Sequence, residues 1–161
     1  MGESIFNKRV DTNVQTCDHI LQKLPYRKPF LFVDTLVSVT ENGVEGRYTF
    51  AADSFFYEGH FVGNPVTPGV ILTEVMAQIG VVCLGIFLLS DSSINDLKIA
   101  MTSTQIDFYQ PVFPGETVTV RSVKEYYRFQ KLKCNVEMRN SREELVCRGS
   151  IAGMMNVKSD A

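Results

Sequence analysis

Residues 67–89 read TPGVILTEVMAQIGVVCLGIFLL, and from Val70 onward they form about 20 mostly apolar positions, the length that crosses a lipid bilayer as a helix. The run contains Thr73, Glu74 and Gln78, has no Lys or Arg close to either end, and is followed by acidic residues. These features disfavour a membrane span. A helix that is apolar on nearly every side belongs in the centre of a soluble fold, so we expect residues 67–89 to form a buried central helix.

The segments on both sides of this helix are mainly strand-like. A short amphipathic helix is expected over residues 14–24, where Pro25 ends it. Strands are expected at about residues 30–40 and 44–50, joined by a hairpin turn at Asn42-Gly43, and then at 98–109, 116–127, 130–139 and 143–157. An antiparallel sheet wrapped around one central helix accommodates this order, which predicts an α+β fold.

Length, composition and charge limit the number of domains and the class of partner. The chain has 161 residues, of which 45% are hydrophobic, so we expect one domain over residues 1–161, with residues 1–12 and 158–161 flexible. Its 16 Lys+Arg and 18 Asp+Glu give a net charge of -2, and no long basic run is present. Nucleic-acid binding is therefore disfavoured.

Cysteine and histidine usage bears on redox state and on metals. The four cysteines are widely separated, form no C-x-x-C pair and follow no secretory leader, which favours reduced core thiols in a cytoplasmic protein. The chain has two histidines, His19 and His60, so a zinc site would need cysteine ligands at spacings that are not present. We expect no metal.

The loop before the central helix carries candidate oxyanion donors. Residues 59–70 read GHFVGNPVTPGV, in which Thr67 suits the N-cap and Pro68 the first helical position. The backbone N–H groups of Gly69 and Val70 then lack partners within the helix, and with the positive end of the helix dipole they could bind a developing oxyanion. The Thr67 hydroxyl could occupy one of these donors.

Two ionisable residues complete an acid/base pattern. Glu74 lies in an apolar helix, where desolvation should raise its pKa and suit it to the role of general acid. Gln78, one turn later on the same face, could hydrogen-bond to Glu74 or hold a water. Imidazole is the commonest general base in enzymes, and glycines and prolines around His60 should fix its position.

Each of these features also has a plain structural explanation. A lone loop histidine is more often a hydrogen-bonded structural residue, and a Gly/Pro cluster is often only a turn. A glutamate in an apolar helix could face solvent or a subunit interface. The combination of all three in this order and spacing is what favours acid/base chemistry.

Four segments, taken in order, give the chain a family resemblance. They read LPYRKPFLFVD at 24–34, FFYEGHFVGNPVTPGV at 55–70, EVMAQ at 74–78 and DFYQPVFPGE at 107–116. Over about residues 18–155 the chain resembles the FabZ-type (3R)-hydroxyacyl-acyl carrier protein dehydratases. The resemblance implies a hotdog fold, an antiparallel sheet wrapped around the helix at about residues 67–89.

The resemblance also implies a reaction and its residues. It implies elimination of water from a (3R)-hydroxyacyl thioester on acyl carrier protein to give the trans-2-enoyl product, without cofactor or metal. His60 would remove the C2 proton, Gly69 would bind the thioester oxygen and Glu74 would protonate the leaving hydroxyl. Val70, Phe61 and Gln78 are expected to line the substrate site. Glutamate at position 74, where the related dehydratase/isomerases carry aspartate, favours the plain dehydratase.

In this family the site lies between two subunits. The resemblance therefore implies a homodimer in which His60 works with the partner subunit's Glu74, and it allows a trimer of dimers. Because acyl carrier protein is acidic, we also expect a basic docking area, although strand alternation could equally expose these side chains only to water. The candidates are Arg121, Lys124, Arg128, Lys131 and Lys133.

Three positions depart from the family pattern. Tyr26 stands where the family usually has histidine, a change expected to alter packing but not activity. Val62 replaces a proline, and Phe108 is followed by Tyr109-Gln110 where an aromatic residue and arginine are usual. These departures leave open a dehydratase dedicated to a polyene or special-lipid pathway. A hotdog thioesterase, an enoyl-CoA hydratase and a non-enzymatic partner subunit are further alternatives.

Overall fold

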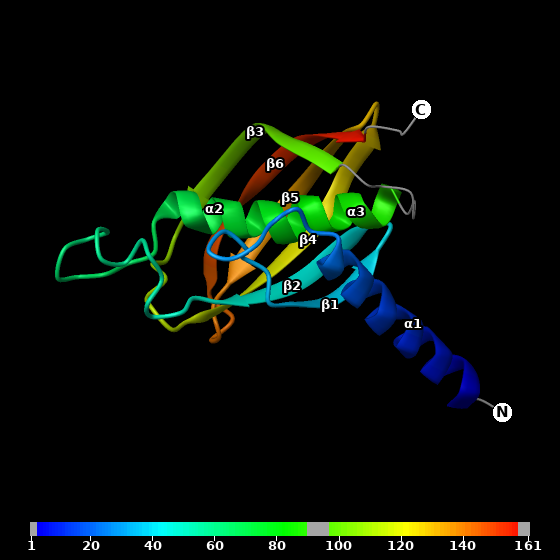
Figure 1. The fold of residues 1–161 in the computed structure, drawn as a ribbon, viewed down its shortest axis with the longest axis horizontal. Coiled ribbons are helices and arrows are strands. Elements are labelled where there is room, and N and C mark those ends of the chain that lie inside the picture. Colours follow the sequence, from blue (N-terminus) through cyan, green and yellow to red (C-terminus); the bar gives the residue numbers. More distant parts are fainter. Residues whose placement is uncertain (1–2, 90–96, 158–161) are drawn as a thin grey trace.

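The computed structural model describes residues 3–89 and 97–157. In chain order the elements are α1 (Glu3–Gln22), β1 (Thr35–Thr40), β2 (Gly43–Thr49), α2 (Gly69–Ala77), η1 (Gln78–Cys83), α3 (Leu84–Leu89), β3 (Leu97–Phe108), β4 (Thr117–Arg128), β5 (Lys131–Arg139) and β6 (Leu145–Val157). The strands form one six-stranded sheet in the order β1-β2-β4-β5-β6-β3, with every pair antiparallel. Helices α2, η1 and α3 follow one another across a single face of this sheet (Figure 1). The α+β arrangement expected from the sequence is confirmed.

The central helix is a core helix. The helix Gly69–Leu89 is long and apolar enough to cross a membrane, but 72% of its most apolar 18-residue stretch is buried inside the protein. The helix approaches the sheet closely because glycines remove side chains at the contact: a Cβ on Gly46 would lie 2.8 Å from the Ile79 side chain. Burial of this length of apolar helix against the sheet stabilises the fold.

The start of the helix differs from the expectation. The N-cap is Pro68, with no side-chain hydrogen bond, so the prediction of Thr67 as N-cap is wrong. The buried Thr67 hydroxyl instead lies 2.6 Å from the Tyr57 hydroxyl, and the Thr67 N–H donates to the Val112 carbonyl at 2.8 Å. The side chain is turned into the core, away from the first helical turn.

The middle of the helix is not α-helical. Residues Gln78–Cys83 form a π-helix, which loosens the regular hydrogen-bond ladder. The Ser122 hydroxyl of β4 donates to the Gly80 carbonyl at 2.8 Å, so this buried carbonyl has a partner in the sheet. Nothing in the hydrophobic pattern distinguishes a π-helix from an α-helix, and we predicted one continuous helix.

Two strand boundaries also differ. The first strand begins at Thr35 rather than at about residue 30, because the preceding backbone bonds to the helix: the Phe32 N–H donates to Gln78 Oε1 at 2.8 Å. The β1–β2 hairpin pairs Thr40 with Gly43, which moves the turn one residue earlier than predicted. Gly43 is needed for close packing, since a Cβ there would lie 2.2 Å from the Ser122 carbonyl oxygen.

Helix α1 begins at Glu3, well before the expected start at residue 14, and ends before Pro25 as expected. Cys17 and Ile20 are buried and anchor its C-terminal part, while its N-terminal part points away from the sheet (Figure 1). The expected flexibility of residues 1–12 stays a prediction. That of residues 158–161 falls outside the described residues.

The cysteines are core thiols, as predicted. All four are free and buried. Burial raises the pKa of Cys134 to about 11 and that of Cys147 to about 12, which suppresses the reactive thiolate. The core of the described residues is one connected hydrophobic cluster that joins the central helix to the sheet. The expectation of a single domain over residues 1–161 stays a prediction.

Candidate active site

The segment between β2 and α2 is tied to the connection between β3 and β4. At its start the Phe50 N–H donates to the Glu116 carbonyl at 2.9 Å, and at its end the Thr67 N–H reaches Val112. Both ends are therefore held in place, and the loop extends from the N-terminal end of the central helix (Figure 1). This attachment holds the candidate base, His60, near the start of α2.

His60 has one ring nitrogen engaged and one available. Its Nδ1 lies 2.9 Å from the Val66 carbonyl oxygen. A carbonyl oxygen only accepts hydrogen bonds, so Nδ1 carries the proton and Nε2 of the neutral ring carries the lone pair. The Phe61 ring stacks on the imidazole with a centroid distance of 4.2 Å. The ring is thus oriented, and its tautomer is the one that a general base requires.

The turn that follows His60 is closed by its own backbone. Phe61 and Asn64 exchange two hydrogen bonds, at 3.3 and 2.9 Å, and Gly63 has φ +73°, which a residue with a side chain rarely adopts. Positive φ at the third position is typical of a type II turn, whose second position favours proline. Val62 occupies that second position, so the turn closes without the proline usual in the family.

The first helical turn offers the expected oxyanion donors. Because Thr67 does not cap the helix, the N–H groups of Gly69 and Val70 have no acceptor within the described part of the chain. Gly69 lines a cavity of about 310 Å³ beside residues from the end of β3, and Val70 is 76% exposed. A substrate carbonyl can therefore reach backbone donors at the positive end of the helix.

Glu74 lies one turn further along, partly buried. Burial raises the pKa of its carboxyl above the ordinary value, while a hydrogen bond from Gln78 partly opposes the shift. Gln78 Nε2 donates to Glu74 Oε1 at 3.0 Å, which confirms the contact expected from their spacing. No other hydrogen bond to Glu74 is found in residues 3–89 and 97–157, so its second oxygen remains available.

Gln78 acts on this site indirectly. It is 0% exposed and donates its second N–H to the Phe30 carbonyl at 3.0 Å, while its oxygen accepts from the Phe32 N–H. Both amide hydrogens are therefore used. Gln78 positions Glu74 and the 30–32 segment, and it has no N–H left for the direct contact with substrate that the sequence suggested.

Replacing Gln78 by the similarly sized methionine should destabilise the protein strongly. The buried Phe32 N–H would lose its partner at a cost of about 1–3 kcal/mol, and the lost bond to the partly buried Phe30 carbonyl adds to this. Chemical denaturation measures this loss. The exposed Gln22→Met variant in α1 is the matched control, with an expected change within about 0.5 kcal/mol. Equal stability of the two variants would contradict a structural role for Gln78.

Glu74 opens into a cavity that His60 does not line. This cavity, of about 150 Å³, lies between the central helix and strands β3 and β6, and most of the residues that line it have apolar side chains. Tyr26, at a position expected to affect packing and not activity, lines the same cavity. In the sequence, the one indication that Tyr26 could belong to the site was its hydroxyl, at a position where the family usually has histidine. Within one protomer, therefore, Glu74 and His60 face different spaces.

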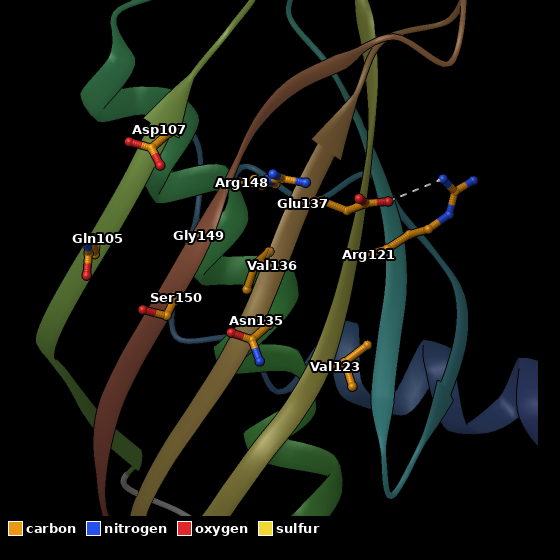
Figure 2. Close-up of a pocket in the computed structure, with 10 residues that line it drawn as sticks. All are labelled: Gln105, Asp107, Arg121, Val123, Asn135, Val136, Glu137, Arg148, Gly149 and Ser150. Carbon is orange, nitrogen blue, oxygen red and sulfur yellow. Dashed lines mark ion pairs between the residues drawn. The ribbon is translucent and has the colours of Figure 1, made fainter.

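The basic docking candidates do not gather beside this site. Arg121 forms ion pairs with Glu45 at 2.9 Å and Glu143 at 3.2 Å, and a longer one with Glu137 at 3.9 Å. It lines an open hollow of about 610 Å³ on the outer face of the sheet (Figure 2), which is larger than the Glu74 cavity but faces away from the central helix. Its charge is already balanced by these glutamates.

The other basic candidates lie toward the opposite end of β4. Arg128 and Lys131 flank the β4–β5 hairpin, about 35 Å along β4 from its start near the His60 loop. Lys133 pairs with Glu125 at 3.6 Å, and Lys124 lies beside the β1–β2 hairpin, where its backbone N–H donates to the Asn42 carbonyl at 2.7 Å. These side chains do not form a basic surface next to His60 of the same protomer.

Comparisons with known proteins agree with this geometry. The 3-hydroxyacyl-(acyl-carrier-protein) dehydratase FabZ of Rhizobium rhizogenes is 33% identical over 155 residues, which cover 92% of this chain and 94% of that protein. The enzyme of the same name from Caldicellulosiruptor saccharolyticus is 33% identical over 137 residues, covering 82% and 92%.

Structure and family comparisons extend this result. The dehydratase heterocomplex ApeI:P from Xenorhabdus doucetiae superposes with a TM-score of 0.67 at 12% identity, covering 86% of this chain and 91% of that one. At such low identity the likeness concerns the fold alone, and it confirms the hotdog fold. The family model of the FabA-like domain matches residues 24–143. The chain therefore belongs to the FabA-like family.

Proposed function

We propose that this protein dehydrates (3R)-hydroxyacyl thioesters on acyl carrier protein to trans-2-enoyl thioesters, in fatty acid or related acyl-chain biosynthesis. The observation that carries the proposal is that the chain supplies both a base with a free lone pair, His60 Nε2, and a carboxyl of raised pKa, Glu74. Its relatives of the FabZ type are named for this reaction. Proton transfer and hydrogen bonding suffice for the chemistry.

Each step of the reaction has a residue. His60 Nε2 accepts the proton from C2, and the negative charge that develops on the thioester oxygen is stabilised by the Gly69 N–H. The C3–O bond breaks as the Glu74 carboxyl gives its proton to the leaving hydroxyl, which departs as water. The electron pair of the C2–H bond becomes the C2–C3 double bond. His60 then loses its proton, and Glu74 regains one from solvent.

A homodimer with shared sites is part of the proposal. Large apolar side chains around the site are exposed in the protomer: Phe61 is 58%, Val62 86% and Val70 76% exposed. Strand β3 is an edge of the sheet, and most of its side chains are exposed as well. A second copy that covers these groups would bring His60 to the partner subunit's Glu74. Assembly of three such dimers is a further prediction.

Mixing two inactive variants tests the shared site. Co-expressed His60→Ala and Glu74→Gln subunits should recover roughly a quarter of the wild-type activity, because random pairing makes half of the dimers mixed and each mixed dimer has one intact site. Each variant alone should remain inactive. Activity is followed as enoyl absorbance. Purified mixed dimers without activity would show that both residues act within one subunit.

The same assay separates the reaction classes. A thioesterase would release free thiol in place of the enoyl product, and a non-enzymatic subunit would release neither. Comparing carrier-protein with coenzyme A thioesters distinguishes an acyl carrier protein dehydratase from an enoyl-CoA hydratase. A panel of short, long and polyunsaturated acyl chains tests whether the enzyme belongs to a specialised pathway. A wild-type protein that neither forms the enoyl thioester nor hydrates it would overturn the proposed function.

The place of the protein in the cell and its docking surface are also proposals. Four free, buried thiols suit a reducing compartment, and we propose the cytoplasm. Of the basic docking candidates, Lys124 in β4 and Arg128 and Lys131 at the β4–β5 hairpin have no ion pair within the described residues. They remain the ones to test by charge reversal, with the salt dependence of KM as the measurement.

A further inference from the structure

The cavity that holds Glu74 contains a second polar side chain. Tyr26 and Glu74 both line it, and the remaining lining residues have apolar side chains or none: Ala77, Val81, Val82, Ile99, Met101, Ile151, Ala152 and Gly153. An acyl chain entering this cavity would therefore meet two groups able to hydrogen-bond, at the same place. The other side chains of the lining would contact its hydrocarbon part.

The hydroxyl of Tyr26 is available to a ligand. Tyr26 is partly exposed, and no hydrogen bond of its hydroxyl is found within the described residues. Among those residues, no fully buried side-chain oxygen or nitrogen lacks a partner, so this hydroxyl is accessible and not sealed in the core. Tyrosine hydroxyls at such places usually find a partner. In this cavity the candidates are the Glu74 carboxyl, water or a substrate oxygen.

Tyr26 is also electrostatically coupled to Glu74. Burial raises the pKa of Tyr26 to about 12, and negative charge on Glu74 and on Cys83 adds to the shift. The phenol therefore keeps its proton at neutral pH and remains a donor. Charge on Glu74 influences Tyr26 because the two groups lie near one another.

Neighbouring contacts connect Tyr26 to the residues that orient Glu74. Its ring lies 6.4 Å from that of Phe30, centroid to centroid. The Phe30 carbonyl accepts one Gln78 N–H, and the other Gln78 N–H holds Glu74 Oε1. One oxygen of Glu74 is thus fixed, while the other has no partner among the described residues.

We propose that Tyr26 is a second catalytic residue on the acid side of the site, whose hydroxyl donates a hydrogen bond to the C3 oxygen as it leaves. The proposal rests on the dehydratase function proposed above. As the C3–O bond breaks, the departing oxygen takes the proton of Glu74 and gains negative charge until that transfer is complete. The Tyr26 O–H stabilises this charge without giving up its own proton. The water formed is then held between Tyr26 and the Glu74 carboxylate.

Removal of the Tyr26 hydroxyl should slow the reaction without weakening substrate binding. Tyr26→Phe is expected to lower kcat on a 3-hydroxyacyl carrier-protein thioester by about 10- to 100-fold, with KM within about twofold of wild type. Tyr48→Phe is the matched control: Tyr48 is also partly buried with a raised pKa, but it does not line the cavity. Its kcat should stay within about twofold of wild type.

A second substrate separates this role from a packing role. A 3-fluoroacyl thioester loses fluoride, a leaving group that needs far less help from a proton donor, while its C2 proton still goes to His60. On this substrate the kcat of Tyr26→Phe and that of Glu74→Gln should each lie less than about threefold below the wild-type kcat. His60→Ala should remain inactive on both substrates.

Two outcomes would overturn the inference while leaving the dehydratase function standing. One is a Tyr26→Phe enzyme with the kcat of the Tyr48→Phe control. The other is an equal loss on the hydroxy and fluoro substrates, which would assign Tyr26 to packing. A wild-type enzyme with no dehydration activity would overturn the proposed function itself, and this inference with it.

Discussion

Replacing His60 by alanine lowers kcat for dehydration by about 10²- to 10⁴-fold, the usual contribution of a positioned general base. His60 is the proposed acceptor of the C2 proton, because Nδ1 donates to the Val66 carbonyl and the lone pair of Nε2 is left free. The measurement is the rate of enoyl formation at saturating substrate.

His19→Ala is the control for this variant. His19 is the other histidine of the chain and lies exposed on α1, so its replacement should leave kcat within about twofold of wild type. The circular dichroism and unfolding midpoint of His60→Ala should match those of wild type, since the ring is only partly buried. A folded His60→Ala enzyme with wild-type kcat would remove His60 from the mechanism.

Replacing Glu74 by glutamine should abolish most activity and at the same time stabilise the protein near neutral pH. Burial holds the pKa of this carboxyl above that of the unfolded chain. The proton that Glu74 binds therefore contributes to stability at pH values below the unfolded pKa, and the contribution is lost as pH rises through the folded pKa. Above the unfolded pKa, Glu74 ionises more easily in the unfolded chain, which destabilises the fold, whereas glutamine cannot ionise and keeps the shape.

Two measurements check this pair of effects. The kcat of Glu74→Gln should fall by about 10²- to 10⁴-fold, and the alkaline decrease in wild-type activity caused by loss of the Glu74 proton should disappear. The difference in unfolding free energy from wild type should grow from acidic to neutral pH. Glu58→Gln, an exposed glutamate in the same loop, should show neither effect. A stability difference that shrinks as pH rises would contradict the direction of the pKa shift.

The hydrophobic pattern predicted most of the secondary structure. It identified the six strands and the buried helix, because alternation and continuous apolar runs reflect which side chains meet the core. Boundaries were less accurate where a long-range contact replaced a local one. The first strand starts late because Gln78, 46 residues away from Phe32, takes the backbone N–H that a ladder would use.

In the active site, too, some residues could be identified from the sequence and one could be placed only by the fold. His60, Glu74 and Gln78 could be identified from residue type and spacing, and the 3.0 Å contact between Glu74 and Gln78 follows from their separation of one helical turn. Tyr26 could not be placed beside Glu74 in this way. It follows α1, far away in the chain, and only the packing of the 25–34 segment against the central helix brings it into the Glu74 cavity.

Local chemistry and side-chain periodicity, then, were sufficient to predict a buried helix, a sheet around it, and an imidazole and a carboxyl suited to proton transfer. Folding alone determined that Thr67 turns inward to Tyr57 and leaves the Gly69 and Val70 donors free. It also determined that Glu74 and His60 open into different spaces. The reason is physical: periodicity records which face of an element is buried, whereas hydrogen-bond partners and cavity walls depend on distances between segments far apart in the chain.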